Sequence, residues 1–431
     1  MDGSILLDIF APANSADQIW RQLAPLTESD WKALILQARR HKITPLMWQR
    51  LKTLGLSERL PKAARQAISA QLRTIASRNL DHYRELVKLL AELEGKGIEV
   101  ILLKGLHLAQ TVYRNLSLRP MVDMDILVRQ EHLAPVQAIL LEWDYVPLKQ
   151  MSIEDCCATS LHLPPLIKAG ETTINIELHW HIEETSNPFA IDLDGLWKRA
   201  QWWQLGSFKV GGLSPEDLLL HFATHTAYHH FFRIGFIAFF DVAKTIEHYG
   251  AVLDWNTLLK RAREWRATRP LFLTLYLAQE LVGASVPTTV LKSLEPLEDW
   301  QKWVELAKRQ LVAGPERKSK ELSTHEKLAL AISNVRKREK GGARLQFIRQ
   351  RLFPARKDLV RFYPWLGNTQ LVYLFLPYHW LRYLNRYVWP LLQSALLGKR
   401  RGEVNTKLQQ LDPNAQLWRW FTDIKRDRDS T

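Results

Sequence analysis

Cysteine is scarce in this sequence: only Cys156 and Cys157 occur, and they are adjacent. Adjacent cysteines are poorly placed for an ordinary disulfide, because the bond requires particular directions of the two Cβ atoms. A small domain held together by disulfides is therefore excluded, and a reducing compartment fits best. The first twenty residues have an early acidic residue and no basic stretch before their short apolar run, so they do not predict a secretory signal. We expect a cytoplasmic protein.

The sequence also lacks a long uninterrupted apolar run. A helix that crosses a bilayer needs roughly 20 consecutive apolar residues. The most apolar window, residues 371–398, is interrupted by His379, Arg382, Arg386, Pro377 and Pro390. No transmembrane segment is therefore predicted. Two interpretations of this window stay open: an amphipathic helix in peripheral contact with a membrane surface, or an aromatic-rich helix packed on the protein's own core.

Internal repeats and low-complexity segments are absent as well. Hydrophobic residues make up 46% of the chain and charged residues 24%, which is typical of a folded globular protein and excludes a disordered or collagen-like one. The length of 431 residues favours two or three domains. The formal net charge of +14 predicts attraction to polyanions, which include nucleotides, nucleic acid and anionic membranes.

The spacing of apolar residues divides the chain into four regions. Residues 1–96 have mainly helical periodicity, and residues 97–210 alternate between strand-like and helical runs. Beyond Asn187 the helical period returns and is expected to persist, through a helical domain at 211–315 and a basic, aromatic-rich helical region at 316–431. The predicted fold class is therefore α+β, with a small mixed sheet flanked by an N-terminal helical segment and a C-terminal helical region.

Within the second region three strands are expected, each followed or preceded by a helix. Gly97 ends the first helical region, and Gly105 marks a turn from a strand to a helix. The predicted strands cover 98–104, 124–128 and 172–182, and the predicted helices cover 106–115 and 132–143.

Two acids on the second predicted strand are the most informative feature. Asp123 and Asp125 lie two residues apart, so on a strand their carboxylates would project from the same face. A third acid, Glu177, lies on an alternating strand that could be a neighbour in the same sheet. A bound cation relieves the repulsion between such acids, and Mg²⁺ is held in this way by one or two carboxylates together with substrate phosphates. Three acids suffice for a two-metal phosphoryl or nucleotidyl transfer site.

Residues upstream of the acids suit a phosphate group. Lys104 and Gly105 end a buried strand and begin a helix, where backbone N–H groups and the helix N-terminus favour anions. Lys104 or Arg119 would neutralise further phosphate charge. Each piece alone is weak, and the acid pair alone could equally be a solvated sheet edge. The order of strand, glycine turn, helix, acid pair and later acidic strand is much more specific.

Residues 102–128, LLKGLHLAQTVYRNLSLRPMVDMDILV, followed by INIELHWHI at 174–182, resemble an uncharacterised bacterial nucleotidyltransferase family of the polymerase-β-type superfamily. The resemblance implies a nucleotidyltransferase domain at 97–210 that takes a nucleoside triphosphate and Mg²⁺ (or Mn²⁺). It implies transfer of a nucleoside monophosphate to an acceptor hydroxyl, with release of pyrophosphate. It assigns the metal to Asp123, Asp125 and Glu177, which are also the catalytic residues, and the phosphate side to Lys104 and Gly105.

One departure from the superfamily pattern supports an alternative function. The small turn of the superfamily usually has Gly followed by Ser or Gly, whereas here Leu106 follows Gly105. The alternative is a catalytically silent module of the same fold that binds nucleotide or a polyanionic partner. The acceptor, the preferred base and the oligomeric state are not encoded in any motif of the sequence.

Histidines recur every four residues on a predicted helix, at His221, His225 and His229, with His230 beside the last. Such spacing can place imidazoles on one face for a metal. The alternative is that they line the groove between the helical region and the α/β domain. His225 is then the candidate to contact substrate phosphate.

Three further residues have a structural and a functional interpretation each. His179 and His181 follow Glu177 along the strand and share its face, so either could orient a carboxylate or simply be bonded to backbone. Asp241 lies in an apolar run and needs a buried partner, for which Arg233 or a histidine of the preceding helix is available. An ion pair is favoured over a general-base role for Asp241.

The C-terminal region combines basic runs with tryptophans. The stretch at 316–351 is rich in Lys and Arg, and the chain has 17 tryptophans, many of them beside polar residues. Such a region could bind RNA or another polyanion, with stacked bases and neutralised phosphates. The alternatives are a solvated basic face and tryptophans that anchor helix packing.

Overall fold

The computed structural model describes residues 4–11, 13–184, 187–314 and 413–422, and it has the predicted α+β class. Apart from 413–416, the described residues belong to one compact unit. The basic stretch at 316–351 and the aromatic window at 371–398 lie outside the described residues. No helix in the described part of the chain combines the length and the apolar character that crossing a membrane requires.

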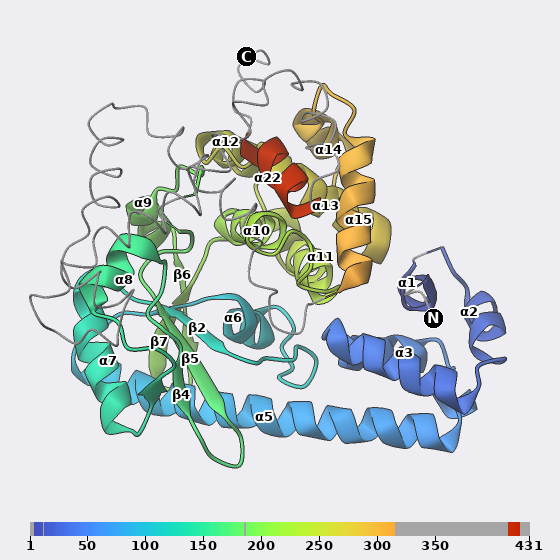
Figure 1. Ribbon diagram of the computed structural model, residues 1–431, viewed down its shortest axis with the longest axis horizontal. Helices are drawn as coiled ribbons and strands as arrows, with labels where there is room; N and C mark the ends of the chain where they lie inside the picture. The colour runs from blue at the N-terminus through green and yellow to red at the C-terminus, as the bar shows by residue number, and fades with distance from the viewer. Residues whose placement is uncertain (1–3, 12, 185–186, 315–412, 423–431) are drawn as a thin grey trace, which may run out of the picture. The chain divides into compact units, whose positions relative to one another are not determined.

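The N-terminal region is helical, as predicted. Ser15 and Gln18, and likewise Thr27 and Asp30, form reciprocal capping interactions that start the second and third helices. The last helix of the region begins directly after Pro61, as expected, and Figure 1 shows it running along both the other N-terminal helices and the sheet. The elements are α1 (Ser4–Phe10), α2 (Ala16–Leu23), α3 (Glu28–Arg40), α4 (Thr44–Thr53), the 3₁₀ turn η1 (Ser57–Arg59) and α5 (Lys62–Gly95).

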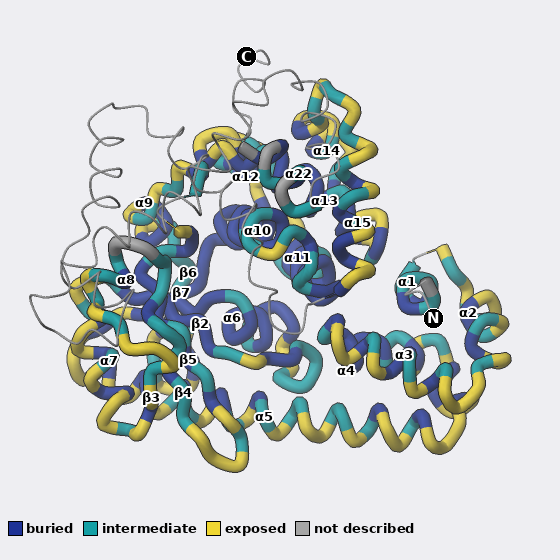
Figure 2. Tube along the Cα trace, viewed as in Figure 1, coloured by how far each residue is buried: buried dark blue, intermediate teal, exposed yellow. Residues whose placement is uncertain are grey.

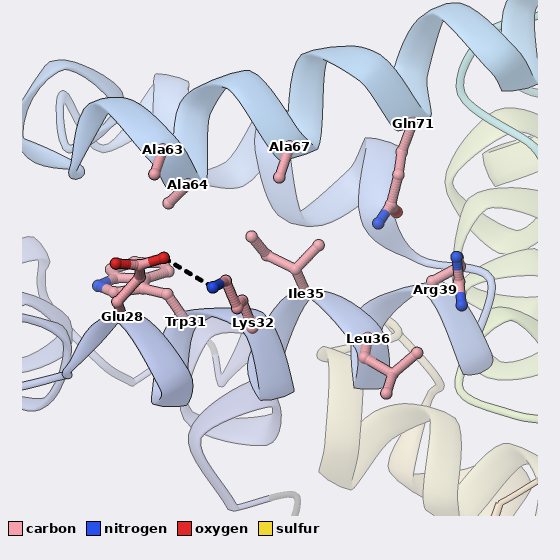
Figure 3. A pocket seen from close by; sticks show the side chains of 10 residues that line it. All are labelled: Glu28, Trp31, Lys32, Ile35, Leu36, Arg39, Ala63, Ala64, Ala67 and Gln71. Atoms are coloured by element: carbon pink, nitrogen blue, oxygen red, sulfur yellow. Dashed lines mark ion pairs between the residues drawn. The ribbon is translucent and has the colours of Figure 1, made fainter.

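A pocket of about 250 Å³ opens between α3 and α5 (Figure 3). Its walls come from these two helices alone, so it is separate from the acids that the sequence singled out. Its floor is mainly apolar, with an ion pair between Lys32 and Glu28 at one end. The lining residues are Glu28, Trp31, Lys32, Ile35, Leu36, Arg39, Ala63, Ala64, Ala67 and Gln71.

A seven-stranded mixed sheet follows, with strand order β3-β4-β5-β2-β1-β7-β6. Pairs β2–β5 and β1–β7 are parallel, and the other pairs are antiparallel. The strands are short and apolar on both faces near the centre, as in a sheet covered on two sides. They are β1 (Ile101–Leu102), β2 (Met124–Leu127), β3 (Val146–Pro147), β4 (Leu166–Lys168), β5 (Ile174–His179), β6 (Gln201–Leu205) and β7 (Phe208–Gly212).

Two expectations for this region were wrong. The helical period does not persist beyond Asn187, because β6 and β7 form a hairpin around Gly206 at φ +64°. The two strands, QWWQL and FKVGG, do not alternate regularly between apolar and polar residues, but the Gly206 turn between them is a hairpin signal. The first helix after β1 begins at Lys104, so Gly105 lies inside its first turn. The helices of this region are α6 (Lys104–Thr111), η2 (Gln130–His132), α7 (Leu133–Glu142), α8 (Ile153–Thr159) and α9 (Leu193–Lys198).

The C-terminal helices start with the cap that the sequence indicates: the Ser214 side chain accepts a hydrogen bond from the backbone N–H of Asp217, and Pro215 occupies the first turn. The last described helix is anchored by Trp420, whose ring stacks on Trp303 with centroids 5.2 Å apart. The elements are α10 (Pro215–Thr224), the π-helical turn η3 (His225–His229), α11 (Ile237–Tyr249), η4 (Gly250–Val252), α12 (Trp255–Glu264), α13 (Thr268–Val282), α14 (Thr288–Leu294), α15 (Gln301–Ala313) and α22 (Pro413–Thr422).

The core has two parts. One is formed by the helices, and the other by the sheet with α7 and the C-terminal half of α5. Figure 2 shows α10 and β2 as almost entirely buried, whereas α5 alternates between buried and exposed residues. The acids at 123–125 therefore lie where the sheet meets the buried helices.

Candidate active site

The parallel pairing of β2 with β5 brings two of the predicted acids together. Asp125 and Glu177 are directly opposite each other in the register, so their side chains point to the same face of the sheet. Asp125 is 4% exposed. Two carboxylates facing each other at this depth need positive charge nearby.

His179 joins these acids. Its Nε2 donates to Asp125 Oδ1 over 2.9 Å and lies 3.7 Å from Glu177 Oε2. One potential ligand atom from each of these three residues lies within 4.8 Å of the others, and no further such group is found among the described residues. The sequence left open whether His179 orients a carboxylate, and the structure shows that it does. The other candidate, His181, accepts from the backbone N–H of Glu183 instead.

Lys104 supplies a second contact to the same carboxylate. Its Nζ lies 3.1 Å from Asp125 Oδ1. The backbone of Lys104 has φ +44°, a left-handed conformation that is strained for a residue with a side chain. The strain lies where Leu103 leaves the sheet and α6 begins, and it places the ammonium group over β2.

The charges in this group shift one another's pKa values. Burial opposes ionisation of Asp125, but the Lys104 ammonium and the hydrogen bond from His179 outweigh it and lower the pKa of Asp125 far below its usual range. Burial likewise disfavours charged Lys104, and the neighbouring acids outweigh burial and raise the pKa of Lys104. The pair is therefore ionised at neutral pH.

Asp123 lies just before the first residue of β2 and is half-buried. Its carboxylate is not within the group of three, yet burial and repulsion by Asp125 raise the pKa of Asp123 to about 6. Such repulsion is what the spacing of the acid pair predicts. A cation bound between Asp123 and Asp125 would lower the pKa of Asp123 again.

Arg119 and Gly105 are packed together beside the acids. A Cβ on Gly105 would lie 2.9 Å from an Arg119 guanidinium nitrogen. Glycine is therefore needed at this position, because the Arg119 side chain packs directly against its backbone. That guanidinium donates to Asp241, with its closest nitrogen 2.8 Å from Oδ2, and Tyr113 donates to the same carboxylate over 2.9 Å. Asp241 is thus in a structural ion pair, as favoured, but Arg119 and Tyr113 are partners that the sequence did not suggest.

The histidine row extends from α10 into η3. The rings of His221, His225 and His229 follow one another with centroids 5.8 Å apart. Burial and then the charge of Lys104 hold the pKa of His221 and of His225 well below the usual value, so both are neutral. None of the three belongs to a metal-ligand group among the residues that the structure describes.

Two residues near the site were not found from the sequence. Glu183 is fully buried and binds His229 Nε2, which continues the polar row away from the acids. Lys42, in the turn between α3 and α4, interacts electrostatically with Asp123 and Asp125. No motif indicates either residue, because both reach the site through tertiary packing between distant segments.

The comparison with known families agrees with this geometry. A family described as uncharacterised nucleotidyltransferase matches residues 27–283, more than half of the chain. The chain belongs to this nucleotidyltransferase family. The match begins at Thr27, the N-cap of α3, and ends at Gly283, the C-cap of α13, so all site residues above lie within it. The chain matched none of the curated proteins with which it was compared.

Membership of a nucleotidyltransferase family gives the cluster of acids a chemical interpretation. Transfer of a nucleotide needs a divalent metal to bind phosphate oxygens. Potential ligand atoms of Asp125, Glu177 and His179 lie within 4.8 Å of one another, and the two carboxylates of this group fit a divalent ion.

Proposed function

We propose that the protein is a metal-dependent nucleotidyltransferase of the polymerase-β type, which transfers a nucleoside monophosphate from a nucleoside triphosphate to an acceptor hydroxyl and releases pyrophosphate. The observation that carries the proposal is the register of β2 and β5, which sets Asp125 opposite Glu177 in a buried sheet. Asp123, Asp125 and Glu177 are the proposed catalytic acids. Family membership supports the general reaction, and the acceptor stays open.

The same acids would hold Mg²⁺ or Mn²⁺, since carboxylate oxygens suit both ions. When bound, such an ion neutralises phosphate charge and lowers the pKa of the acceptor hydroxyl. The chain itself fixes the direction of the Asp125 carboxylate through His179 before any ligand arrives. Low exposure of Asp125 and His179, at 4% and 1%, keeps bulk water away from this point.

Lys104, Gly105, Arg119 and His225 are the proposed nucleotide side of the site. Lys104 would contact phosphate directly through its ammonium group, which lies 3.1 Å from Asp125 Oδ1, and His225 of the histidine row is the second proposed contact. Gly105 and Arg119 would position the phosphate side of the site through packing. The Arg119 guanidinium is paired with Asp241 and packs over Gly105. Together they hold the segment that leads into Asp123.

A substitution at Asp125 tests the proposal. Asp125→Asn keeps the size of the side chain and a group that can accept from His179, but it removes the negative charge. Turnover of nucleoside triphosphates should fall by about 1,000-fold or more, because the charge that binds the metal is lost. Purified protein would be assayed for pyrophosphate release with Mg²⁺ or Mn²⁺, with a cell extract as acceptor source. A variant that releases pyrophosphate at the wild-type rate would rule the proposal out.

A second function has its own supporting observation. Leu106 takes the place of the small residue that the superfamily has after this glycine, and it is 1% exposed. A silent nucleotide-binding module is the alternative. It predicts metal-dependent binding of nucleotide without release of pyrophosphate, even with an extract present.

The contacts proposed for residues 316–431, with RNA, another polyanion or a membrane surface, lie outside the described residues except for α22. In that helix Trp418 donates to the Tyr228 hydroxyl over 3.1 Å, and Trp420 donates to Glu298. These tryptophans therefore anchor the helix. Cytoplasmic location and bacterial origin stay predictions.

A further inference from the structure

The turn between α3 and α4 has an unusual conformation at Lys42. Its backbone φ is +58°, in the left-handed region that lysine rarely adopts. The N–H of Lys42 donates to the carbonyl of Arg39 over 3.1 Å, and the N–H of Ile43 donates to the carbonyl of Ala38 over 2.9 Å. These bonds end α3 and fix the direction in which the Lys42 side chain leaves the helix.

This turn is packed directly on the segment that starts α11. A Cβ on Gly235, which has φ +100°, would lie 3.0 Å from the Cα of His41. The carbonyl of His41 accepts from the N–H of Ile237 over 3.3 Å, and its ring lies 4.4 Å from the ring of Phe236. Because backbone meets backbone here, Lys42 is held in place relative to α11.

α11 connects this contact to the acids. Asp241 lies one helical turn after Ile237, so it is on the same face of α11. Asp241 forms an ion pair with Arg119, which precedes Asp123 by four residues in the sequence. The contacts from His41 through α11 to Arg119 therefore connect the Lys42 turn to the segment that precedes Asp123, although about 80 residues separate Lys42 from Asp123 in sequence.

The charges around Lys42 leave its ammonium group available to bind an anion. Lys104 is paired with Asp125, and Arg119 is paired with Asp241. Lys42 forms no ion pair or hydrogen bond through its ammonium with any residue that the structure describes. Partial burial and repulsion by Arg119 lower the pKa of Lys42, against attraction by Asp123. A phosphate group beside it would favour the charged form.

We propose that Lys42 binds the triphosphate of the nucleotide, so that the N-terminal helical segment completes the phosphate side of the site. The inference rests on the proposed function. A triphosphate carries several negative charges, and lysine binds phosphate as a compact point charge. Lys104 shares its charge between Asp125 and the phosphate that it contacts, so a second ammonium group, that of Lys42, would take up charge at the phosphates farther from the base.

Binding measurements on purified full-length protein with Mg²⁺ test this assignment. Lys42→Met removes the charge and keeps nearly the length of the side chain. Lys42→Asn also removes the charge, and asparagine tolerates the left-handed backbone. Both variants should bind nucleoside triphosphate about 10- to 100-fold more weakly, the loss expected for one charged hydrogen bond. Both should bind nucleoside monophosphate as the wild type does. Lys42→Arg should recover most of the affinity.

The matched control is Lys62→Met, which removes one charge from an exposed position at the start of α5. It should bind like the wild type. The melting temperature identifies any Lys42 variant that is unfolded. If Lys42→Met is unfolded, the affinity of Lys42→Asn for triphosphate decides the test. Equal losses for triphosphate and monophosphate, or wild-type affinity for triphosphate in a folded charge-removing variant, would overturn the role of Lys42. Failure of the proposed function is distinct: the wild type would then bind no triphosphate, or Asp125→Asn would bind it equally well.

Discussion

At the scale of single residues, one carboxylate oxygen of Asp125 contacts two other side chains of the site. Asp125 Oδ1 receives both the Lys104 ammonium and the His179 imidazole, at 3.1 Å and 2.9 Å. A carboxylate held from two directions cannot rotate freely, so its second oxygen is aimed by the same contacts. The geometry around a ligand of Asp125 is then set by the protein rather than by the ligand.

Removal of the His179 donor should therefore weaken metal binding. We expect His179→Phe to lower Mg²⁺ or Mn²⁺ affinity by about 10- to 100-fold, the usual cost of losing a group that orients a metal ligand. His179→Gln keeps a donor and should lose less. Metal titration by calorimetry in the presence of nucleotide measures both variants. Wild-type affinity in a folded His179→Phe would show that the contact does not orient the carboxylate.

A second residue-scale prediction concerns the ion pair of Arg119 with Asp241. The side chains are 13% and 5% exposed, so loss of one charge leaves the other buried and uncompensated. We expect Asp241→Asn to lower the free energy of unfolding by about 3–5 kcal/mol. Tyr113→Phe removes only a hydrogen bond to the same carboxylate and should cost about 1 kcal/mol. Denaturant unfolding compares the two variants, and equal costs would contradict the ion-pair account.

At the scale of elements, three of the seven strands of the sheet were predicted, namely β1, β2 and β5. The alternation around Glu177 and the apolar run around Asp125 both mark strands, and the structure pairs those strands in parallel. The register of these two strands follows from their pattern. Residues two apart on a strand share a face, and a shift by one residue would move the apolar residues off the buried face. The helices after Pro61 and Ser214 each have a local start signal, the proline of the first and the capping serine of the second.

Other elements depend on contacts that no local pattern encodes. The β6–β7 hairpin was missed because its strands lack regular alternation, and the start of α6 at Lys104 requires a left-handed lysine. The approach of Lys42 to the acids depends on the backbone of Gly235 lying on His41. Such tertiary contacts join segments far apart in sequence, so a single sequence does not indicate them.

The contact of η3 with the segment after β5 has a pH dependence. Burial disfavours the charged form of His229, but Glu183 outweighs burial and raises the pKa of His229. A raised pKa in the folded state stabilises the protein fully below the unfolded value of about 6.5, and this stabilisation is lost as pH rises through the folded pKa. Glu183→Gln should therefore cost roughly 2 kcal/mol at pH 6 and less at pH 9. Unfolding curves at both values check this, and a cost that grows with pH would contradict the pairing.

At the scale of the whole molecule, the site draws on three parts of the chain. The sheet supplies Asp125 and Glu177, α11 supplies Asp241, and the turn after α3 supplies Lys42 as the proposed phosphate contact. All of them fall within residues 27–283, the span that matches the nucleotidyltransferase family. The net charge of +14 for the full chain comes from residues 316–431, because Lys and Arg equal Asp and Glu in number in residues 1–315.

The most direct test of the central claim is nucleotide binding measured with and without divalent metal. The four ribonucleoside triphosphates would be titrated into wild-type protein and into Asp125→Asn, with Mg²⁺, with Mn²⁺ and with chelator. The account predicts that at least one triphosphate binds the wild type only with metal, and that this binding is lost in a variant that melts at the wild-type temperature. Binding that is independent of metal, or that survives in Asp125→Asn, would contradict it.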